Sequence, residues 1–144
     1  MNDPVAILKR DHREVAAMLK TLDASKPGAR RRSTVAKMTK ALTLHMDIEE
    51  HIIYPEVARL VGKEDAKEAG IEHGLVRDGL EQVNKLVDQP GFGAAVAMIT
   101  AGIKHHVKEE ETEVFPDLKR KLDRDELAAL GDAVATAKKS GRTR

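Results

Sequence analysis

The chain has 144 residues, which suits one domain with a single buried core. Hydrophobic residues make up 41% and charged residues 34%, and this balance excludes both a disordered chain and a membrane-embedded one. The formal net charge of +1 creates no overall field that would favour nucleic acid or an anionic membrane. We therefore interpret the basic clusters at 30–32 and 142–144 as solvated surface.

The absence of cysteine excludes disulfides, thiolate metal sites and a thiol nucleophile. The N-terminal Met-Asn-Asp-Pro has neither the basic nor the apolar stretch of a signal peptide. No apolar run approaches the ~18 residues that a membrane span requires. These features predict a cytoplasmic protein with no membrane or nucleic-acid partner, and we expect a monomer or a weak homodimer.

The spacing of apolar residues predicts helices throughout the chain. A first helix begins at about Pro4, with Asp3 or Asn2 as its N-cap, and ends before the Pro27-Gly28 break. The other helices are expected at about 29–60, 64–87, 92–122 and 123–139, the second kinked or closed by Pro55 and the fifth opened by a capping box of Asp123 and Glu126.

Apolar residues recur at alternating intervals of three and four on the four long helices, and short turns join them. This pattern predicts an all-α, antiparallel up-down four-helix bundle with a short C-terminal fifth helix. The predicted domain spans 1–139, and we expect a flexible tail at 140–144.

An internal repeat relates the two halves of this domain, at about 3–60 and 64–121. A shift of 61 residues places the first helix pair on the second without a gap. Polar residues inside the apolar stripes follow the same shift, since His12 matches His73, His45 matches His106, and Glu49 matches Glu110. The repeat predicts two similar helical hairpins whose four histidines and two glutamates converge in the bundle interior.

Buried carboxylates require a compensating positive charge, and no lysine or arginine lies in these stripes. A bound cation supplies that charge and also gives the imidazole nitrogens a partner. Six ligands are too many for one structural zinc ion, but they suit two metals bridged by two carboxylates. Nitrogen and carboxylate ligands without thiolate favour iron or manganese. The remaining histidines, His51 and His105, break the repeat, and we place them at the surface or behind the ligands.

The ordered motif His12, His45-x-x-x-Glu49, His73, His106-x-x-x-Glu110 resembles the hemerythrin-like (HHE cation-binding) domain family, in particular its small stand-alone mycobacterial-type members. The resemblance runs from about Asp3 to Leu118. It implies a four-helix bundle around a non-haem di-iron centre with carboxylate and oxo or hydroxo bridges, manganese being less favoured. The four histidines would be terminal ligands and the two glutamates bridges. Ferritin-like bundles, by contrast, place glutamate before histidine at i,i+3.

Three further residues are candidates to tune such a centre. Arg77 occupies the position where oxygen-carrying hemerythrins have a fifth histidine, and it either pairs with a carboxylate or extends to solvent. Glu113 lies one turn beyond Glu110 and is either a proton relay or a solvated charge. Tyr54 either packs at the bundle end or, if the helix unwinds before Pro55, becomes an additional metal ligand. Those hemerythrins also differ in their final carboxylate, usually an aspartate one residue beyond the position of Glu110.

Two functions remain open from the sequence. The resemblance favours an enzyme, a catalase-like di-iron oxidoreductase that disproportionates hydrogen peroxide and also handles nitric oxide in oxidative or nitrosative stress. Open coordination positions on both metals are consistent with this chemistry. The alternative is a module that binds or senses oxygen or nitric oxide reversibly without turnover. A purely structural bundle would have to bury six polar side chains without a metal.

Overall fold

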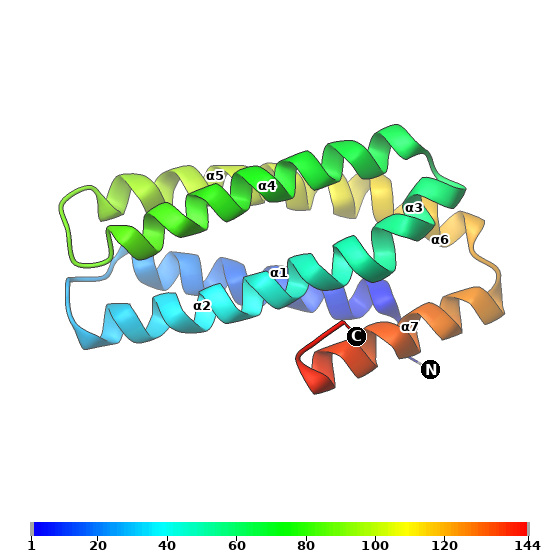
Figure 1. The fold of residues 1–144 in the computed structure, drawn as a ribbon, viewed down its shortest axis with the longest axis horizontal. Helices are drawn as coiled ribbons and strands as arrows, with labels where there is room; N and C mark the ends of the chain where they lie inside the picture. The colour runs from blue at the N-terminus through cyan, green and yellow to red at the C-terminus, as the bar shows by residue number, and fades with distance from the viewer. Residues whose placement is uncertain (1, 144) are drawn as a thin grey trace.

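The computed structural model describes residues 2–143, which form helices and short turns without a β-strand. Four long helical runs lie antiparallel, and a shorter C-terminal helix lies beside them (Figure 1). This confirms the predicted all-α four-helix bundle with a fifth helix. In chain order the elements are α1 (Pro4–Asp23), α2 (Ala29–Ile48), the π-helical η1 (Glu49–Ile53), α3 (Tyr54–Leu60), α4 (Lys63–Lys85), α5 (Phe92–Glu109), the π-helical η2 (Glu110–Val114), α6 (Phe115–Lys121) and α7 (Arg124–Ser140).

Local capping chemistry sets the first residues of α1 and α7. The Asp3 carboxylate accepts hydrogen bonds from the backbone N–H groups of Val5 (2.9 Å) and Ala6 (3.3 Å) at the start of α1. At α7 the Asp123 carboxylate accepts from Glu126 N–H, and the Glu126 carboxylate accepts from Asp123 N–H. The predicted N-cap and the predicted capping box are both confirmed.

Two helical hairpins build the bundle, α1 with α2–η1–α3 and α4 with α5–η2–α6. The turns inside both hairpins lie at one end of the molecule, and α3 and α6 lie at the other (Figure 1). Apolar side chains fill the interior in two clusters, one toward each end. Their members include Leu19, Met38, Leu80 and Ile99 toward the turns, and Leu8, Ile53, Phe115 and Val134 toward α3 and α6.

Helix α7 packs along α1 and covers one side of the first hairpin (Figure 1). Its buried residues Leu130, Val134 and Ala137 join the apolar cluster near α3 and α6. At Gly131 the backbone of α7 lies so close to the N-terminal segment that an added Cβ would come within 1.8 Å of the Asn2 carbonyl oxygen. Helix α7 ends at Ser140, and residue 144 of the expected tail lies outside the described residues.

The interpretation of residues 30–32 as solvated surface was wrong for Arg31. This side chain is buried, and its guanidinium lies 4.1 Å from the centre of the Phe92 ring. It donates hydrogen bonds to the Ser25 and Val87 carbonyl oxygens, at 2.6 and 3.1 Å. Arg31 therefore joins the turn of the first hairpin to that of the second, a contact that only the packed bundle brings together.

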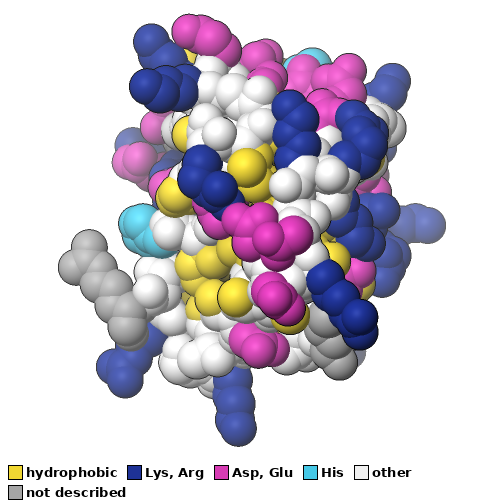
Figure 2. Space-filling view, turned by 90° about the vertical axis from the view of Figure 1, so that its right-hand side faces the viewer, with side chains coloured by type: hydrophobic (Ala, Val, Ile, Leu, Met, Phe, Trp, Pro, Cys, Tyr) yellow, Lys and Arg dark blue, Asp and Glu magenta, His cyan; other side chains and the backbone are white. Residues whose placement is uncertain are grey.

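The surface carries mixed charge. Figure 2 shows Lys, Arg, Asp and Glu side chains interspersed across the end of the molecule that faces the viewer. No helix among the described residues is both long enough and apolar enough to span a membrane.

Candidate metal centre

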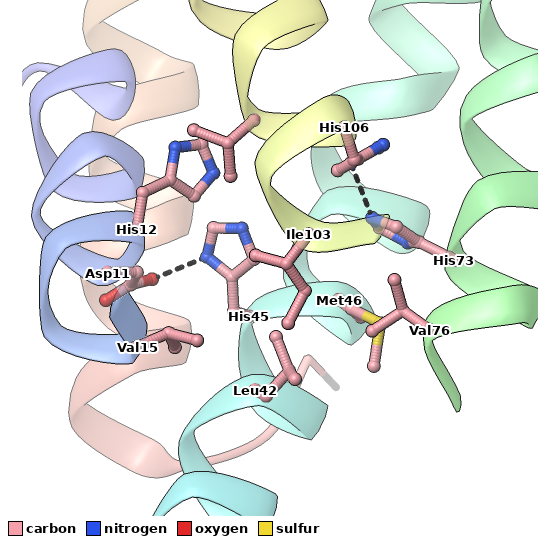
Figure 3. A pocket seen from close by; sticks show the side chains of 11 residues that line it. Asp11, His12, Val15, Leu42, His45, Met46, His73, Val76, Ile103 and His106 are labelled. Carbon is pink, nitrogen blue, oxygen red and sulfur yellow. Dashed lines mark hydrogen bonds and ion pairs between the residues drawn. The ribbon is translucent and has the colours of Figure 1, made fainter. Parts of the chain in front are cut away.

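Six buried polar side chains meet between the two apolar clusters. One histidine comes from each of the four long helices (Figure 3). The two glutamates are the first residues of the two π-helical segments. All six are at most 7% exposed. These residues are His12 on α1, His45 on α2, Glu49 on η1, His73 on α4, His106 on α5 and Glu110 on η2. The structure thus brings together every ligand that the repeat predicted.

The histidines face the carboxylates through their Nε2 atoms. Glu49 Oε1 lies 3.2 Å from His45 Nε2 and 3.0 Å from His73 Nε2. The two oxygens of Glu110 divide between the halves, with Oε1 3.2 Å from His12 Nε2 and Oε2 3.3 Å from His106 Nε2.

Two ligand groups result from this arrangement. The first is His12 and His45 with both glutamates, and the second is His73 and His106 with the same glutamates. Within each group the candidate ligand atoms lie within 4.8 Å of one another. Because both groups share both carboxylates, the arrangement suits two cations held side by side.

Three buried polar atoms in this centre have no hydrogen-bond partner. They are His12 Nε2, Glu49 Oε2 and Glu110 Oε1. A buried polar atom without a partner is destabilising, and such atoms in native proteins are few. A cation would satisfy all three at once, because each is an atom that commonly ligates iron or manganese. The donor set therefore fits a metal pair.

Each histidine also bonds a carboxylate through its other ring nitrogen, Nδ1. Such outer carboxylates orient imidazole ligands and make them more basic. The pairs are His12 with Glu111 (2.7 Å), His45 with Asp11 (2.8 Å), His73 with Glu50 (2.7 Å) and His106 with Glu72 (2.6 Å). Sequence reasoning missed these four carboxylates. The signal was present, since Asp11 matches Glu72 and Glu50 matches Glu111 under the same 61-residue shift.

Two of the outer carboxylates are themselves paired with cations. Lys138 on α7 donates to Asp11 Oδ1 at 2.6 Å. Arg77 on α4 donates to Glu50 Oε2 at 2.8 Å and to Asp47 Oδ1 at 3.0 Å. Of the two alternatives for Arg77, the structure thus shows pairing with a carboxylate, and it acts on the centre only through Glu50.

The electrostatics of the centre are those of a site that holds positive charge. Burial alone would lower the pKa of His45, but Glu49 and Asp11 outweigh it and raise this pKa to about 10. Against the same effect of burial, Glu110 and Glu49 raise the pKa of His106 to about 11. Burial opposes ionisation of Glu49, yet the three imidazoles around it hold its pKa well below the usual range. Protons on the imidazoles thus supply the charge that a cation can replace.

Tyr54 points into the centre. Its hydroxyl donates to Glu110 Oε2 at 2.6 Å, and His73 Nε2 and His106 Nε2 lie 3.0 and 3.1 Å from the hydroxyl oxygen. Burial and the charges of Glu49 and Glu110 raise the pKa of Tyr54, so the hydroxyl keeps its proton in the protein alone. Its counterpart in the repeat, Phe115, stacks on His12 instead, with the rings 6.0 Å apart.

The π-helical segment η1 causes this orientation of Tyr54. In an α-helix, residues five apart differ in direction by about 140°, so Glu49 and Tyr54 would not share a face. In η1 the Tyr54 N–H donates to the Glu49 carbonyl five residues earlier, and this wider turn aligns the two side chains. The helical run continues through Pro55 to Leu60, so Pro55 does not close it, and the residues before Pro55 form this wider helical turn. Proline has no N–H and crowds the carbonyl four residues before it, and the wider turn relieves both problems.

The other candidates lie away from the ligands. Glu113 is exposed, and it lines a surface depression together with His106 and Glu110. His51 is exposed, and its Nδ1 lies 2.9 Å from the Thr143 hydroxyl. His105 is 65% exposed and contacts Glu72 at 3.5 Å, so it reaches the centre only through the carboxylate that His106 bonds.

Comparison with known proteins agrees with this geometry. Residues 3–118 match the family described as the hemerythrin HHE cation binding domain. The chain belongs to this family. Both ligand groups lie within the residues that match the hemerythrin HHE family, which is described as cation binding.

A curated relative from Nostoc sp. (strain PCC 7120), named DNA nickase, also resembles this hemerythrin HHE chain. The two are 24% identical over 133 residues, which is 92% of this chain but only 38% of the Nostoc protein. No solved structure matches this chain significantly.

Proposed function

We propose that this protein is a di-iron oxidoreductase that disproportionates hydrogen peroxide in a catalase-like reaction and also handles nitric oxide under oxidative or nitrosative stress. The observation that carries the proposal is the pair of ligand groups that share two buried glutamates. In each group two histidines and two carboxylates leave room for further ligands, which catalysis at a metal requires. When bound, two irons would supply exchangeable coordination positions and the capacity to transfer two electrons.

A small cavity beside the histidines supports the choice of a small substrate. Its volume is about 20 Å³, which limits an occupant to a molecule of a few atoms. Figure 3 shows its lining, in which all four histidines face apolar side chains such as Val15, Leu42 and Val76. Only a small molecule, such as hydrogen peroxide, oxygen or nitric oxide, matches this space.

The residues of the chain itself provide proton handling. The Tyr54 hydroxyl donates a hydrogen bond to Glu110 Oε2, with 2.6 Å between the two oxygens, and so places a proton beside the carboxylate. The outer carboxylates keep each imidazole oriented with Nε2 toward the centre. The apolar lining keeps bulk water away from the cavity.

The nicking activity named for the Nostoc protein is not part of this proposal. The chain covers only 38% of that protein, and the end of the molecule in Figure 2 carries mixed charge rather than the broad basic face that suits a phosphate backbone.

Metal analysis and a peroxide assay on one sample test the proposal. We expect roughly two irons per chain and oxygen evolution on addition of hydrogen peroxide. Glu49→Gln and His106→Ala are expected to lower iron content and to cut oxygen evolution by at least about tenfold. His51→Ala is the matched control, because His51 is exposed and contacts none of the ligands. A protein that binds no iron under these conditions would refute the proposal.

The same sample distinguishes the alternative function. Full iron occupancy without oxygen evolution, together with a reversible change in absorption when the reduced protein meets air, would favour reversible binding of oxygen. The apolar lining of the cavity is compatible with that function as well, so the peroxide assay decides between the two.

A further inference from the structure

The two hairpins meet along two grooves that the repeat makes equivalent. The α1–α5 groove has a volume of about 710 Å³ and lies over His12. The α2–α4 groove has a volume of about 520 Å³ and lies on the other side of the bundle. Positions in the two grooves correspond under the 61-residue shift, so a difference between them reflects particular substitutions.

Only one of the two grooves adjoins the internal cavity at the histidines. The α1–α5 groove shares His12, Ile103 and Val107 with the lining of that cavity. Among the described residues, the α2–α4 groove and the cavity have no lining residue in common. These three side chains line both the groove and the cavity, and Figure 3 shows two of them, His12 and Ile103, at the cavity.

Two substitutions between the halves place an ion pair between α2 and α4 that has no equivalent between α1 and α5. Arg77 on α4 reaches across to α2, where its Nη2 lies 3.0 Å from Asp47 Oδ1. The equivalent positions in the first groove are Ala16 and Lys108. The Ala16 side chain is too short to cross the groove and carries no charge that could pair with Lys108. No ion pair between these two positions therefore joins α1 to α5.

The α1–α5 groove is also positively charged. Lys20, Lys104 and Lys108 line it, against the single carboxylate of Asp23, and all three lysines are exposed. The lining of the α2–α4 groove carries one lysine and one carboxylate, which cancel. A concave surface of one sign concentrates ligands of the opposite sign and raises their association rates.

We propose that the α1–α5 groove is the entrance to the metal centre and that it admits small inorganic anions faster than neutral molecules of equal size. This inference rests on the proposed function, since it assumes a metal pair at the histidines. The lysines attract the anion to the mouth of the groove. The cavity volume of about 20 Å³ then limits it to a few atoms.

Azide association with the oxidised, iron-loaded protein tests the charge of the entrance, by stopped-flow absorption. Lys104→Glu/Lys108→Glu is expected to lower the second-order rate constant about tenfold at low ionic strength. The difference should shrink toward twofold near 1 M salt, where the Debye length is only ~3 Å. Lys37→Glu/Lys40→Glu makes the same charge change on α2 and is expected to have less than a twofold effect. The association rate of neutral nitric oxide with the reduced protein should be similar in the wild type and in both lysine variants.

A second variant tests the route by closing it. Ala16→Arg/Lys108→Asp places in the α1–α5 groove the residue types that stand at Arg77 and Asp47 in the other. It is expected to slow azide and nitric oxide alike, by about tenfold or more, at every salt concentration. Iron content and the absorption spectrum before azide should match the wild type, which separates a blocked route from a damaged centre.

The outcomes separate this inference from the proposed function. Equal slowing by both lysine pairs would show that only overall charge matters and would overturn the inference. Azide rates that are the same in the wild type, the Lys104/Lys108 variant and the Ala16/Lys108 variant would also overturn the inference. That result would leave the proposed metal centre unaffected. A wild-type protein that gives no azide-dependent spectral change would overturn the metal assignment and the entrance together.

Discussion

Replacing Tyr54 with phenylalanine removes one hydroxyl from the most crowded part of the centre. That hydroxyl lies 2.6 Å from Glu110 Oε2, 3.2 Å from Glu49 Oε1, and 3.0 and 3.1 Å from the Nε2 atoms of His73 and His106. It is a shared hydrogen-bond partner for four buried groups that belong to both hairpins. The substitution keeps the ring, so packing changes little and the loss is confined to polar contacts.

We expect Tyr54→Phe to destabilise the metal-free protein by about 1–3 kcal/mol, the usual range when a buried polar group loses its partner. Glu110 bears most of this loss, because its Oε1 already has no hydrogen-bond partner and Oε2 would lose the shortest of its contacts. The metal-loaded protein should lose less, because a cation satisfies the carboxylates and imidazoles directly. If the hydroxyl oxygen also binds the metal, the variant will lose a visible phenolate-to-iron absorption band.

Urea unfolding of chelator-treated and iron-loaded samples measures both effects, and absorption spectra of the loaded samples measure the third. The Phe115→Leu variant is the packing control, since Phe115 occupies the equivalent position and carries no hydroxyl. It should destabilise both forms by similar amounts. An unchanged unfolding midpoint for metal-free Tyr54→Phe would refute the role given to this hydroxyl. An unchanged visible spectrum would rule out Tyr54 as a ligand.

Three further outcomes are expected. Lys138→Met removes one of the two partners of the buried Asp11 carboxylate, the other being His45, and should destabilise the protein by about 1–2 kcal/mol in urea unfolding, discounted for the partial exposure of the lysine. An unchanged midpoint would contradict this. Gly131→Ala places a Cβ 1.8 Å from a carbonyl oxygen and should cost about 1–3 kcal/mol, whereas Gly70→Ala, with no atom within 4 Å of the new Cβ, should be neutral or stabilising by up to ~1 kcal/mol. Metal loading at pH 7 should release protons, because the pKa of His45 is raised to about 10 in the metal-free protein and a metal requires the neutral imidazole. The affinity for the metal should therefore fall as pH is lowered. A pH-stat titration that detects no released proton would contradict the electrostatics of the centre.

The helices and their approximate ends could be predicted from the sequence, because they depend on residues near one another in the chain. Asp3 caps α1 and Asp123 caps α7 through contacts with backbone groups two or three residues away. The apolar stripes repeat every three or four residues, and that period alone specifies which side of each helix is buried. The structure confirms these elements.

The residues of the centre could be proposed from the sequence because the chain carries the same pattern twice. A single buried histidine has many explanations, but His12, His45 and Glu49 recur 61 residues later within matching stripes. The outer carboxylates obey the same repeat and could have been found in the same way. Asp11 and Glu50 went unrecognised because each lies beside the apolar stripe, where charged residues are expected to be solvated.

Other features depended on contacts between distant parts of the chain. Arg31 is buried only because the turns of both hairpins meet around it. Lys138 reaches Asp11 only because α7, which lies outside the repeat, packs along α1. Neither contact could be predicted from neighbouring residues in the sequence, because each depends on a partner from a distant part of the chain.

The sequence by itself thus determined the helices, their buried faces and the paired set of histidines and glutamates, because these follow from local periodicity and from the repeat. The tertiary structure decided how the two halves differ. It placed the Tyr54 hydroxyl among the ligands, gave two of the four outer carboxylates an arginine or lysine partner, and joined α2 to α4 by the ion pair of Arg77 and Asp47. Such differences arise where side chains from separate helices compete for the same space and charge, and that competition exists only after the bundle has packed.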